Sequence, residues 1–372
     1  MKNRILSLAM FGFVLVLIIS FQNCSAPSSN SVAADSANGT GGATDENNVE
    51  KIPTTTCSMN GVNYQCVTIS YGQHSLQNYE LWLPNGPHAS GDRPLVIYFH
   101  GGGYYAGDKV DAYLKPAVPQ DVKTYDAYSA MPELLNLGYA VATVNYRLVD
   151  ENPFVVGEME FPLQFQDAAW AVQDLRMRAE HYNYNSAKVA LTGVSAGGGL
   201  SLWLAFHDDL KNSASVEARE KFSTKVNCVA VRDTQTTINV SEIQSFLGPN
   251  YEIGHGISTM FGFTPEQYTA EPVLAEQTYG ASMSEASAIK HLNEDDVSIK
   301  VMLSYVLDYG TVNIHAAEFG KYLAEGSPLS VKNKYGRKSL SELGISNTLR
   351  IKQAQLAQKN NMISHINSCF AN

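Results

Sequence analysis

Two glycine-rich segments, each following an apolar run, carry residues suited to acyl-transfer chemistry. The run at 189–192 leads into Gly193-Val194-Ser195-Ala196-Gly197, which fits G-x-S-x-G, a tight strand-to-helix turn that exposes a serine hydroxyl. The run at 94–99 leads into His100-Gly101-Gly102-Gly103, the HGGG pattern, whose backbone N–H groups help to bind the oxyanion formed when a serine attacks a carbonyl. Together the two segments predict serine-based acyl transfer.

Each residue of the two segments has an expected part in that chemistry. Ser195 is the expected nucleophile, and a serine hydroxyl needs an adjacent base to be activated. The N–H groups of Gly102, Gly103 and Ala196 are the expected oxyanion donors, because glycine allows the backbone to approach closely. His100 is expected to orient its loop by hydrogen bonding and not to act as the base.

The elements around these segments alternate between strand and helix patterns. Such alternation predicts an α/β fold, with a mostly parallel sheet and helices on both faces. Ligands of such sheets bind at the carboxyl ends of the strands, where both glycine-rich segments fall. The expected strands are residues 67–71, 79–83, 95–99, 140–146, 189–192, 226–231, 300–307 and 348–351, and the expected helices are 163–182 and 199–206.

Four motifs make the sequence similar to a known family. They are His100-Gly101-Gly102-Gly103, Asn145-Tyr146-Arg147-Leu148, Phe161-Pro162 with Asp167, and the pentapeptide around Ser195. The chain resembles an α/β-hydrolase of the carboxylesterase group related to hormone-sensitive lipase. Residues 201–209, Ile314-His315 and Phe319-Gly320 further resemble a secreted bacterial branch. The resemblance implies hydrolysis of short acyl or acetyl esters without a cofactor.

The acid and the base of the expected triad follow Ser195 in the chain, because α/β-hydrolases order the triad serine, acid, histidine. Asp308 ends an apolar strand pattern and is the expected acid, with Asp233 as a weaker alternative. His315 and His365 are the histidines that follow Asp308. His315 is the preferred base, His365 in the final helix is the alternate, and loss of a working histidine is the third possibility.

A long segment, residues 234–298, separates two expected strands. It is either a cap over the acyl pocket or a packed insertion without a role in the site. Tyr104 and Tyr105 follow the HGGG segment and either line that pocket or pack beside the sheet.

The first residues have the pattern of an export signal. Lys2 and Arg4 precede an apolar run that ends just before Cys24, which predicts a lipoprotein-type signal peptide at 1–23 and a lipidated Cys24. An uncleaved membrane helix is the alternative. Residues 24–55 are poor in large apolar side chains and predict a flexible tether, followed by a hydrolase domain at 56–372. The expected location is the cell envelope, with the protein lipid-anchored on the periplasmic or surface face of a bacterial membrane.

An exported protein can form disulfide bonds, so its cysteines are candidates for pairing. Cys57 and Cys66 flank the hairpin signal Asn60-Gly61 and are a possible pair. A two-residue turn would place Cys57 opposite Tyr64, so the pair is expected to need a longer loop. Cys228 lies in an apolar run and is expected to be a buried free thiol. No spacing of cysteine and histidine predicts a metal site.

A formal net charge of −10 excludes a role that depends on neutralising nucleic-acid phosphates. The sequence therefore predicts an exported, lipid-anchored serine carboxylesterase that acts on a small-molecule ester, without cofactor or metal. Two alternatives stay open. One is a peptidase of the same fold, and the other is a non-catalytic binding protein that has lost its base.

Overall fold

The computed structural model describes residues 51–59, 61–85, 92–112, 130–149, 160–251, 253–306, 315–326, 334–352 and 355–371. The expected signal peptide, Cys24, most of the tether and Asp308 lie outside these residues. In the part of the chain that is described, no helix combines the length and apolar character needed to cross a membrane.

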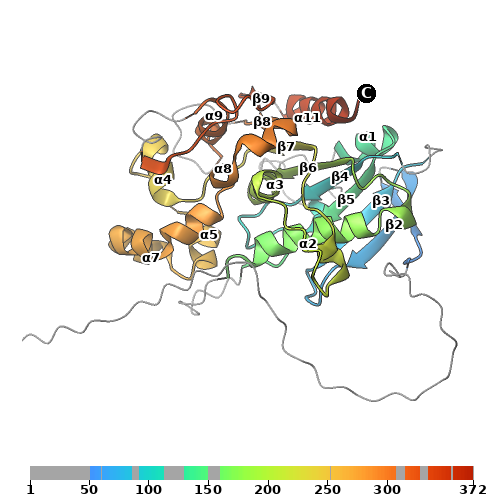
Figure 1. The fold of residues 1–372 in the computed structure, drawn as a ribbon, viewed down its shortest axis with the longest axis horizontal. Helices are drawn as coiled ribbons and strands as arrows, with labels where there is room; N and C mark the ends of the chain where they lie inside the picture. Colours follow the sequence, from blue (N-terminus) through green and yellow to red (C-terminus); the bar gives the residue numbers. More distant parts are fainter. Residues whose placement is uncertain are drawn as a thin grey trace, which may run out of the picture. The chain divides into compact units, whose positions relative to one another are not determined.

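A nine-stranded sheet organises the described chain, in the order β1-β2-β3-β5-β4-β6-β7-β8-β9 (Figure 1). The strands from β5 to β9 in this order pair in parallel, whereas β1, β2, β3 and β5 pair antiparallel. The strands are β1 Thr55–Met59, β2 Val62–Ser70, β3 Asn78–Leu83, β4 Leu95–Phe99, β5 Ala140–Val144, β6 Val189–Val194, β7 Cys228–Arg232, β8 Lys300–Ser304 and β9 Asn347–Arg350. The predicted mostly parallel sheet of an α/β-hydrolase is confirmed.

Helices cover both faces of the sheet, because the central strands are apolar on both sides. Every residue of β4 is buried: Leu95, Ile97 and Phe99 face one core with α2 and α3, and Val96 and Tyr98 face the other with α1 and α11. The helices are α1 Ala130–Asn136, α2 Leu163–Met177, α3 Ala196–Phe206, α4 Val240–Leu247, α5 His255–Met260, α6 Pro265–Ala270, α7 Pro272–Glu285, α8 Ala288–His291, α9 Ala317–Glu325 and α11 Gln355–Phe370.

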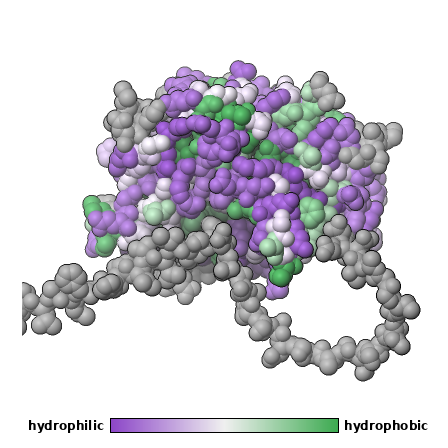
Figure 2. Space-filling model, viewed as in Figure 1, coloured by the Kyte–Doolittle hydropathy of each residue, from purple (hydrophilic) through white to green (hydrophobic). Residues whose placement is uncertain are grey.

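The helices of the insertion, α4 to α8, follow β7, and Figure 1 shows α4, α5 and α7 gathered to one side of the sheet. In the same orientation, the described surface in Figure 2 is mostly hydrophilic, with apolar patches between polar side chains. The predicted helix at 163–182 ends earlier, at Met177, and a short 3-10 turn at Glu180–Tyr182 follows it.

The four cysteines in the described residues form two pairs. Cys57 lies opposite Tyr64, as a two-residue turn requires, yet it bonds to Cys66 diagonally across β1 and β2 with a Cα–Cα distance of 5.9 Å. The expectation of a longer loop is therefore wrong, because diagonal neighbours in an antiparallel pair lie close enough to be bridged. The expectation that Cys228 is a free thiol is also wrong, because Cys228 in β7 is bonded to Cys369 in α11.

Candidate active site

Ser195 lies in a sharp turn between β6 and α3. Its backbone angles are φ 52° and ψ −121°, in a region that costs a non-glycine residue on the order of 1–3 kcal/mol. A Cβ atom at Gly197 would lie 2.1 Å from the Phe99 carbonyl oxygen, and one at Gly193 would lie 2.5 Å from the Gly197 carbonyl carbon. The two glycines therefore let α3 start directly against β4, and this close approach holds the strained turn.

His315 faces the hydroxyl of Ser195. It lies just before α9, and its Nε2 is 2.9 Å from Ser195 Oγ. Burial lowers the pKa of His315 from 6.5 to about 4, so the imidazole is neutral at pH 7 and can accept a proton. This is the distance and the protonation state that a general base for a serine nucleophile needs.

His365, the alternate base, lies elsewhere, and this corrects the sequence analysis. Its Nε2 is 3.3 Å from the carbonyl oxygen of Lys300, the first residue of β8. Ser195 follows the carboxyl end of β6, which runs parallel to β7 and β8. His365 thus lies at the amino-terminal ends of the parallel strands, whereas Ser195 lies at their carboxyl ends.

The expected acid, Asp308, lies outside the described residues. The weaker alternative, Asp233, follows β7, has φ 47°, and accepts a hydrogen bond from Val306 N–H at 2.8 Å through Oδ1. Burial raises the pKa of Asp233. Its contact with Val306 fastens the exit of β8, the segment that leads towards Asp308.

The HGGG loop lies against the nucleophile turn. A Cβ atom at Gly101 would lie 3.0 Å from the Val194 carbonyl oxygen and 3.5 Å from Ser195 Cβ. Gly102 and Gly103 have φ angles of 110° and 62°, which favour glycine. Within the described chain, the N–H groups of Gly102, Gly103 and Ala196 have no hydrogen-bond acceptor in the protein. Donors left in this way beside a nucleophile suit the binding of an oxyanion.

His100 holds this loop in place, as its sequence context predicts. Its Nδ1 is 2.7 Å from the Gly101 carbonyl oxygen, and its ring stacks on Tyr146 with centroids 4.3 Å apart. The Tyr146 hydroxyl donates to the His100 carbonyl oxygen at 2.8 Å. Burial lowers the pKa of His100, so the ring is neutral at pH 7 and needs no counter-ion.

Tyr146 belongs to a second motif, which an ion pair to the buried Asp167 holds against α2. Asp167 is fully buried and receives Arg147 Nη2 at 2.5 Å, Arg147 backbone N–H at 2.9 Å and Gln77 Nε2 at 2.7 Å. The ion pair fixes the loop after β5, which in turn supports His100 through Tyr146. In the sequence, Arg147 and Asp167 are recognisable only as family motifs, although an arginine and an aspartate beside apolar runs suggest an ion pair.

Thr234 is a supporting residue that the sequence analysis missed. Its hydroxyl donates to the Ser195 carbonyl oxygen at 2.8 Å, and it lies against Gly198 of α3. A threonine directly after a strand carries no distinctive signal in the sequence.

The insertion reaches the oxyanion loop through α5. A Cβ atom at Gly256 would lie 1.9 Å from the Gly103 carbonyl oxygen, and the Tyr105 ring lies beside both glycines. Tyr104 is buried and stacks on Phe165, whereas Tyr105 is 37% exposed. Of the two tyrosines, Tyr104 therefore packs beside the sheet, and Tyr105 is the one positioned next to the loop.

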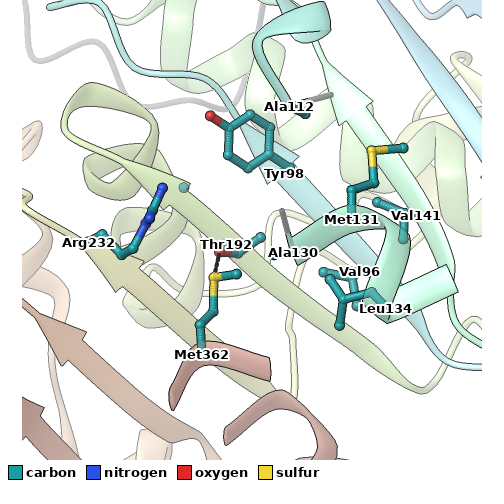
Figure 3. Close-up of a pocket in the computed structure, with 11 residues that line it drawn as sticks. Val96, Tyr98, Ala112, Ala130, Met131, Leu134, Val141, Thr192, Arg232 and Met362 are labelled. Atoms are coloured by element: carbon teal, nitrogen blue, oxygen red, sulfur yellow. Dashed lines mark hydrogen bonds between the residues drawn. The ribbon is translucent and has the colours of Figure 1, made fainter. Parts of the chain in front are cut away.

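A cavity lies in the core under α1 and α11, and Gly193 and Arg232, next to the nucleophile turn, are among its lining residues (Figure 3). Val96, Tyr98, Met131 and Met362 line it, and Thr192 Oγ1 is 3.0 Å from Met362 Sδ. These side chains point to the face opposite α2 and α3. The cavity is a gap in the second core and not a substrate site. The groups of potential metal ligands found in the described chain lie away from Ser195.

Comparison with known proteins places this geometry in a family. The sequence matches the BD-FAE family over residues 80–304, more than half of the chain. The chain belongs to the BD-FAE family. This is an esterase family of α/β-hydrolases, and the matched region contains the HGGG loop, Asp167 and Ser195, whereas His315 follows it.

Curated relatives of this BD-FAE protein match over shorter regions. Esterase LipI of Mycobacterium tuberculosis is 31% identical over 127 residues, 33% of this chain and 32% of the relative. Lipase 2 of Moraxella sp. is 26% identical over 149 residues, 39% of this chain and 30% of the relative. The chain thus spans about a third of the length of these relatives.

Solved structures share the fold of the BD-FAE protein. A truncated carbohydrate esterase from gut microbiota has a TM-score of 0.54 at 16% identity, covering 82% of this chain and 96% of that one. A bifunctional GH43-CE protein of Bacteroides eggerthii has the same TM-score at 15% identity, covering 82% of this chain and 35% of that one. At this identity the likeness supports the α/β-hydrolase fold.

Proposed function

We propose that this BD-FAE protein is an exported, lipid-anchored serine carboxylesterase that hydrolyses short-chain or acetyl-type esters. The observation that carries the proposal is the 2.9 Å distance between His315 Nε2 and Ser195 Oγ. In the non-catalytic alternative no histidine serves Ser195 as a base, and the residues between β9 and α11 contain none. His315, at the start of the segment that forms α9, supplies the base instead, which favours the enzyme.

The reaction follows from the positions of these groups. Ser195 Oγ attacks the ester carbonyl carbon while its proton passes to His315 Nε2, and the carbonyl oxygen becomes an oxyanion. The N–H groups of Gly102, Gly103 and Ala196 stabilise the oxyanion. When the carbon–oxygen bond to the alcohol breaks, His315 returns the proton to the leaving oxygen. Water, deprotonated by His315, then releases the acid from Ser195. Asp308 is the proposed partner that orients His315.

The preference for a short acyl group rests on the insertion. Helix α5 is in contact with the oxyanion loop at Gly256 and Gly103, and Tyr105 lies beside both. This crowding supports the interpretation of residues 234–298 as a cap and leaves little room for a long acyl chain next to the loop. We therefore expect p-nitrophenyl acetate to be hydrolysed faster than p-nitrophenyl esters of long-chain acids.

A fluorophosphonate probe tests the chemistry directly, because it reacts with an activated serine. We expect covalent labelling of the purified protein and none in Ser195→Ala, with Ser201→Ala as the matched control that keeps its labelling. Absence of labelling in folded wild-type protein would refute the esterase. Labelling with no hydrolysis of simple esters but cleavage of peptides would favour the peptidase alternative.

Export and anchoring are supported by independent features. The charged and apolar start of the chain precedes Cys24, and the disulfides Cys57–Cys66 and Cys228–Cys369 suit an oxidising compartment. Mass spectrometry of the protein from the membrane fraction tests this proposal. We expect an acylated Cys24 at the mature N-terminus and release from the membrane in Cys24→Ser. An unmodified Cys24 within an intact N-terminal segment would favour the membrane-helix alternative.

A further inference from the structure

Three helix ends outside the active site bring two histidines and a carboxylate together. His207 follows α3, Glu285 ends α7 and His291 ends α8. Glu285 Oε1 is 4.0 Å from His207 Nε2 and 3.7 Å from His291 Nε2. One ligand atom from each residue lies within 4.8 Å of the other two. We infer that this cluster binds a transition-metal ion, with Zn²⁺ as the ion that fits its donors best.

The donor set and its spacing suit that ion. Zn²⁺ binds imidazole nitrogen and carboxylate oxygen at about 2.0–2.2 Å, which places ligands of a tetrahedral site about 3.4 Å apart. The observed distances of 4.0 Å to His207 and 3.7 Å to His291 exceed this by about 0.6 and about 0.3 Å, which small side-chain rotations can close. A water molecule would complete the coordination.

The surroundings of His207 orient it for metal binding, whereas His291 would have to exchange a hydrogen bond for the metal. His207 Nδ1 is 2.9 Å from the Asp208 carbonyl oxygen, so an N–H on Nδ1 leaves the lone pair on Nε2, towards Glu285. His291 Nε2 is 2.7 Å from the Glu285 carbonyl oxygen and must give up that bond to take a metal. The Trp203 indole N–H donates to the same carbonyl at 3.1 Å, so the carbonyl keeps a partner.

The charges around the cluster have both signs. Lys290 pairs with Glu285 through Oε2, which leaves Oε1 on the side of the imidazoles. Burial lowers the pKa of His207, and lowers that of His291 to about 3, so both rings are neutral, the form that binds metals. The Asp208 carboxylate raises the pKa of both rings, whereas Lys290 lowers both. Lys225 lowers the pKa of His207, and Arg337 lowers that of His291. A bound cation would therefore be favoured by Glu285 and Asp208 and opposed by these three basic side chains.

The position of the cluster indicates a structural site and not a catalytic one. Helix α3 runs from the residue after Ser195 to Phe206, so His207 is about 18 Å along the helix from the nucleophile. Glu285 and His291 belong to the insertion. A bound ion would therefore clamp the insertion to the far end of the nucleophile helix without touching the ester.

Metal titration of the full chain after dialysis against EDTA tests the site. We expect one equivalent of Zn²⁺ to bind and to raise Tm, and Co²⁺ to give the visible absorption of a site with nitrogen and oxygen ligands. His207→Gln and His291→Gln should each weaken binding at least tenfold and remove the Tm rise, while fluorophosphonate labelling of Ser195 shows that they are folded. His74→Gln, a change at an exposed histidine of the β2–β3 loop, is the matched control and should bind like wild type.

Three results would overturn the inference. The first is the absence of stoichiometric binding to wild type. The second is Zn²⁺ binding by both His207→Gln and His291→Gln that is as tight as binding by wild type. The third is binding that is lost only in His315→Gln, since this would place the ion at the active site. If a variant does not fold, the Co²⁺ spectrum and stoichiometry of wild type, measured with Ser195 blocked by fluorophosphonate, still decide whether a site exists.

Discussion

The burial of His315 predicts an esterase that stays active in mild acid. The base must be neutral to accept the Ser195 proton, and burial lowers its pKa from 6.5 to about 4. At pH 5, about 90% of an imidazole with a pKa of 4 is neutral, against about 3% for one with a pKa of 6.5. We therefore expect kcat/KM for p-nitrophenyl acetate at pH 5 to stay close to its value at pH 7, and to fall by half near pH 4.

The lowered pKa of His315 also makes the free energy of unfolding depend on pH. Unfolded protein binds a proton on this histidine at higher pH than folded protein does, so the free energy of unfolding falls as the pH drops from about 6.5 to about 4. The difference of about 2.5 pH units corresponds to about 3 kcal/mol. Loss of activity must therefore be separated from unfolding, by recording near-UV circular dichroism at each pH.

The assay has a control and a clear contrary outcome. His74→Gln removes an exposed histidine and should leave the pH profile unchanged. The rate of fluorophosphonate labelling should follow the same profile as kcat/KM, because it depends on the same proton acceptor. A midpoint near pH 6.5 in protein that is still folded would refute the reasoning, because burial would then not set the pKa of the base.

Three substitutions probe the groups around the site. Asp308→Asn should lower kcat by on the order of 10³–10⁴ with little change in Tm, if Asp308 orients His315; unchanged kcat would reassign the acid. Asp167→Asn removes the buried charge that pairs with the partly exposed Arg147 and should destabilise the protein by up to about 3 kcal/mol in urea unfolding, whereas a loss below about 0.5 kcal/mol would show that the ion pair does not stabilise the fold. Gly197→Ala forces a Cβ atom against Phe99 and should abolish labelling of Ser195, and a fully labelled variant would contradict the close packing of α3 on β4.

Local patterns predicted the parts of the fold that depend on local chemistry. The strand at Leu95–Phe99 was predicted with its observed bounds, because a short apolar run between polar residues fits a strand buried on both faces. The turn residues Asn60-Gly61 predict the observed pairing of Cys57 with Tyr64, although a longer loop is expected once the disulfide is considered, and that expectation is wrong. The turn at Ser195 and the loop at His100 were recognisable from glycines at fixed spacing.

Contacts between segments that are distant in the chain could not be predicted from the sequence. The partner of Cys228 is 141 residues away in the final helix, so nothing near Cys228 reveals the bond. The choice between His315 and His365 depends on which end of the parallel strands each one reaches, and position along the chain does not determine that end. Thr234 supports the Ser195 carbonyl through a hydrogen bond that only the packed turn creates.

The most direct test of the account compares two histidine variants in one assay. His315→Ala should lower kcat/KM for p-nitrophenyl acetate by at least a thousandfold and slow fluorophosphonate labelling of Ser195 in parallel, because His315 Nε2 lies 2.9 Å from Ser195 Oγ. His365 lies at the amino-terminal ends of the parallel strands, away from Ser195, so His365→Ala should keep wild-type activity per folded molecule. Full activity in His315→Ala, or loss confined to folded His365→Ala, would contradict the proposed catalytic site.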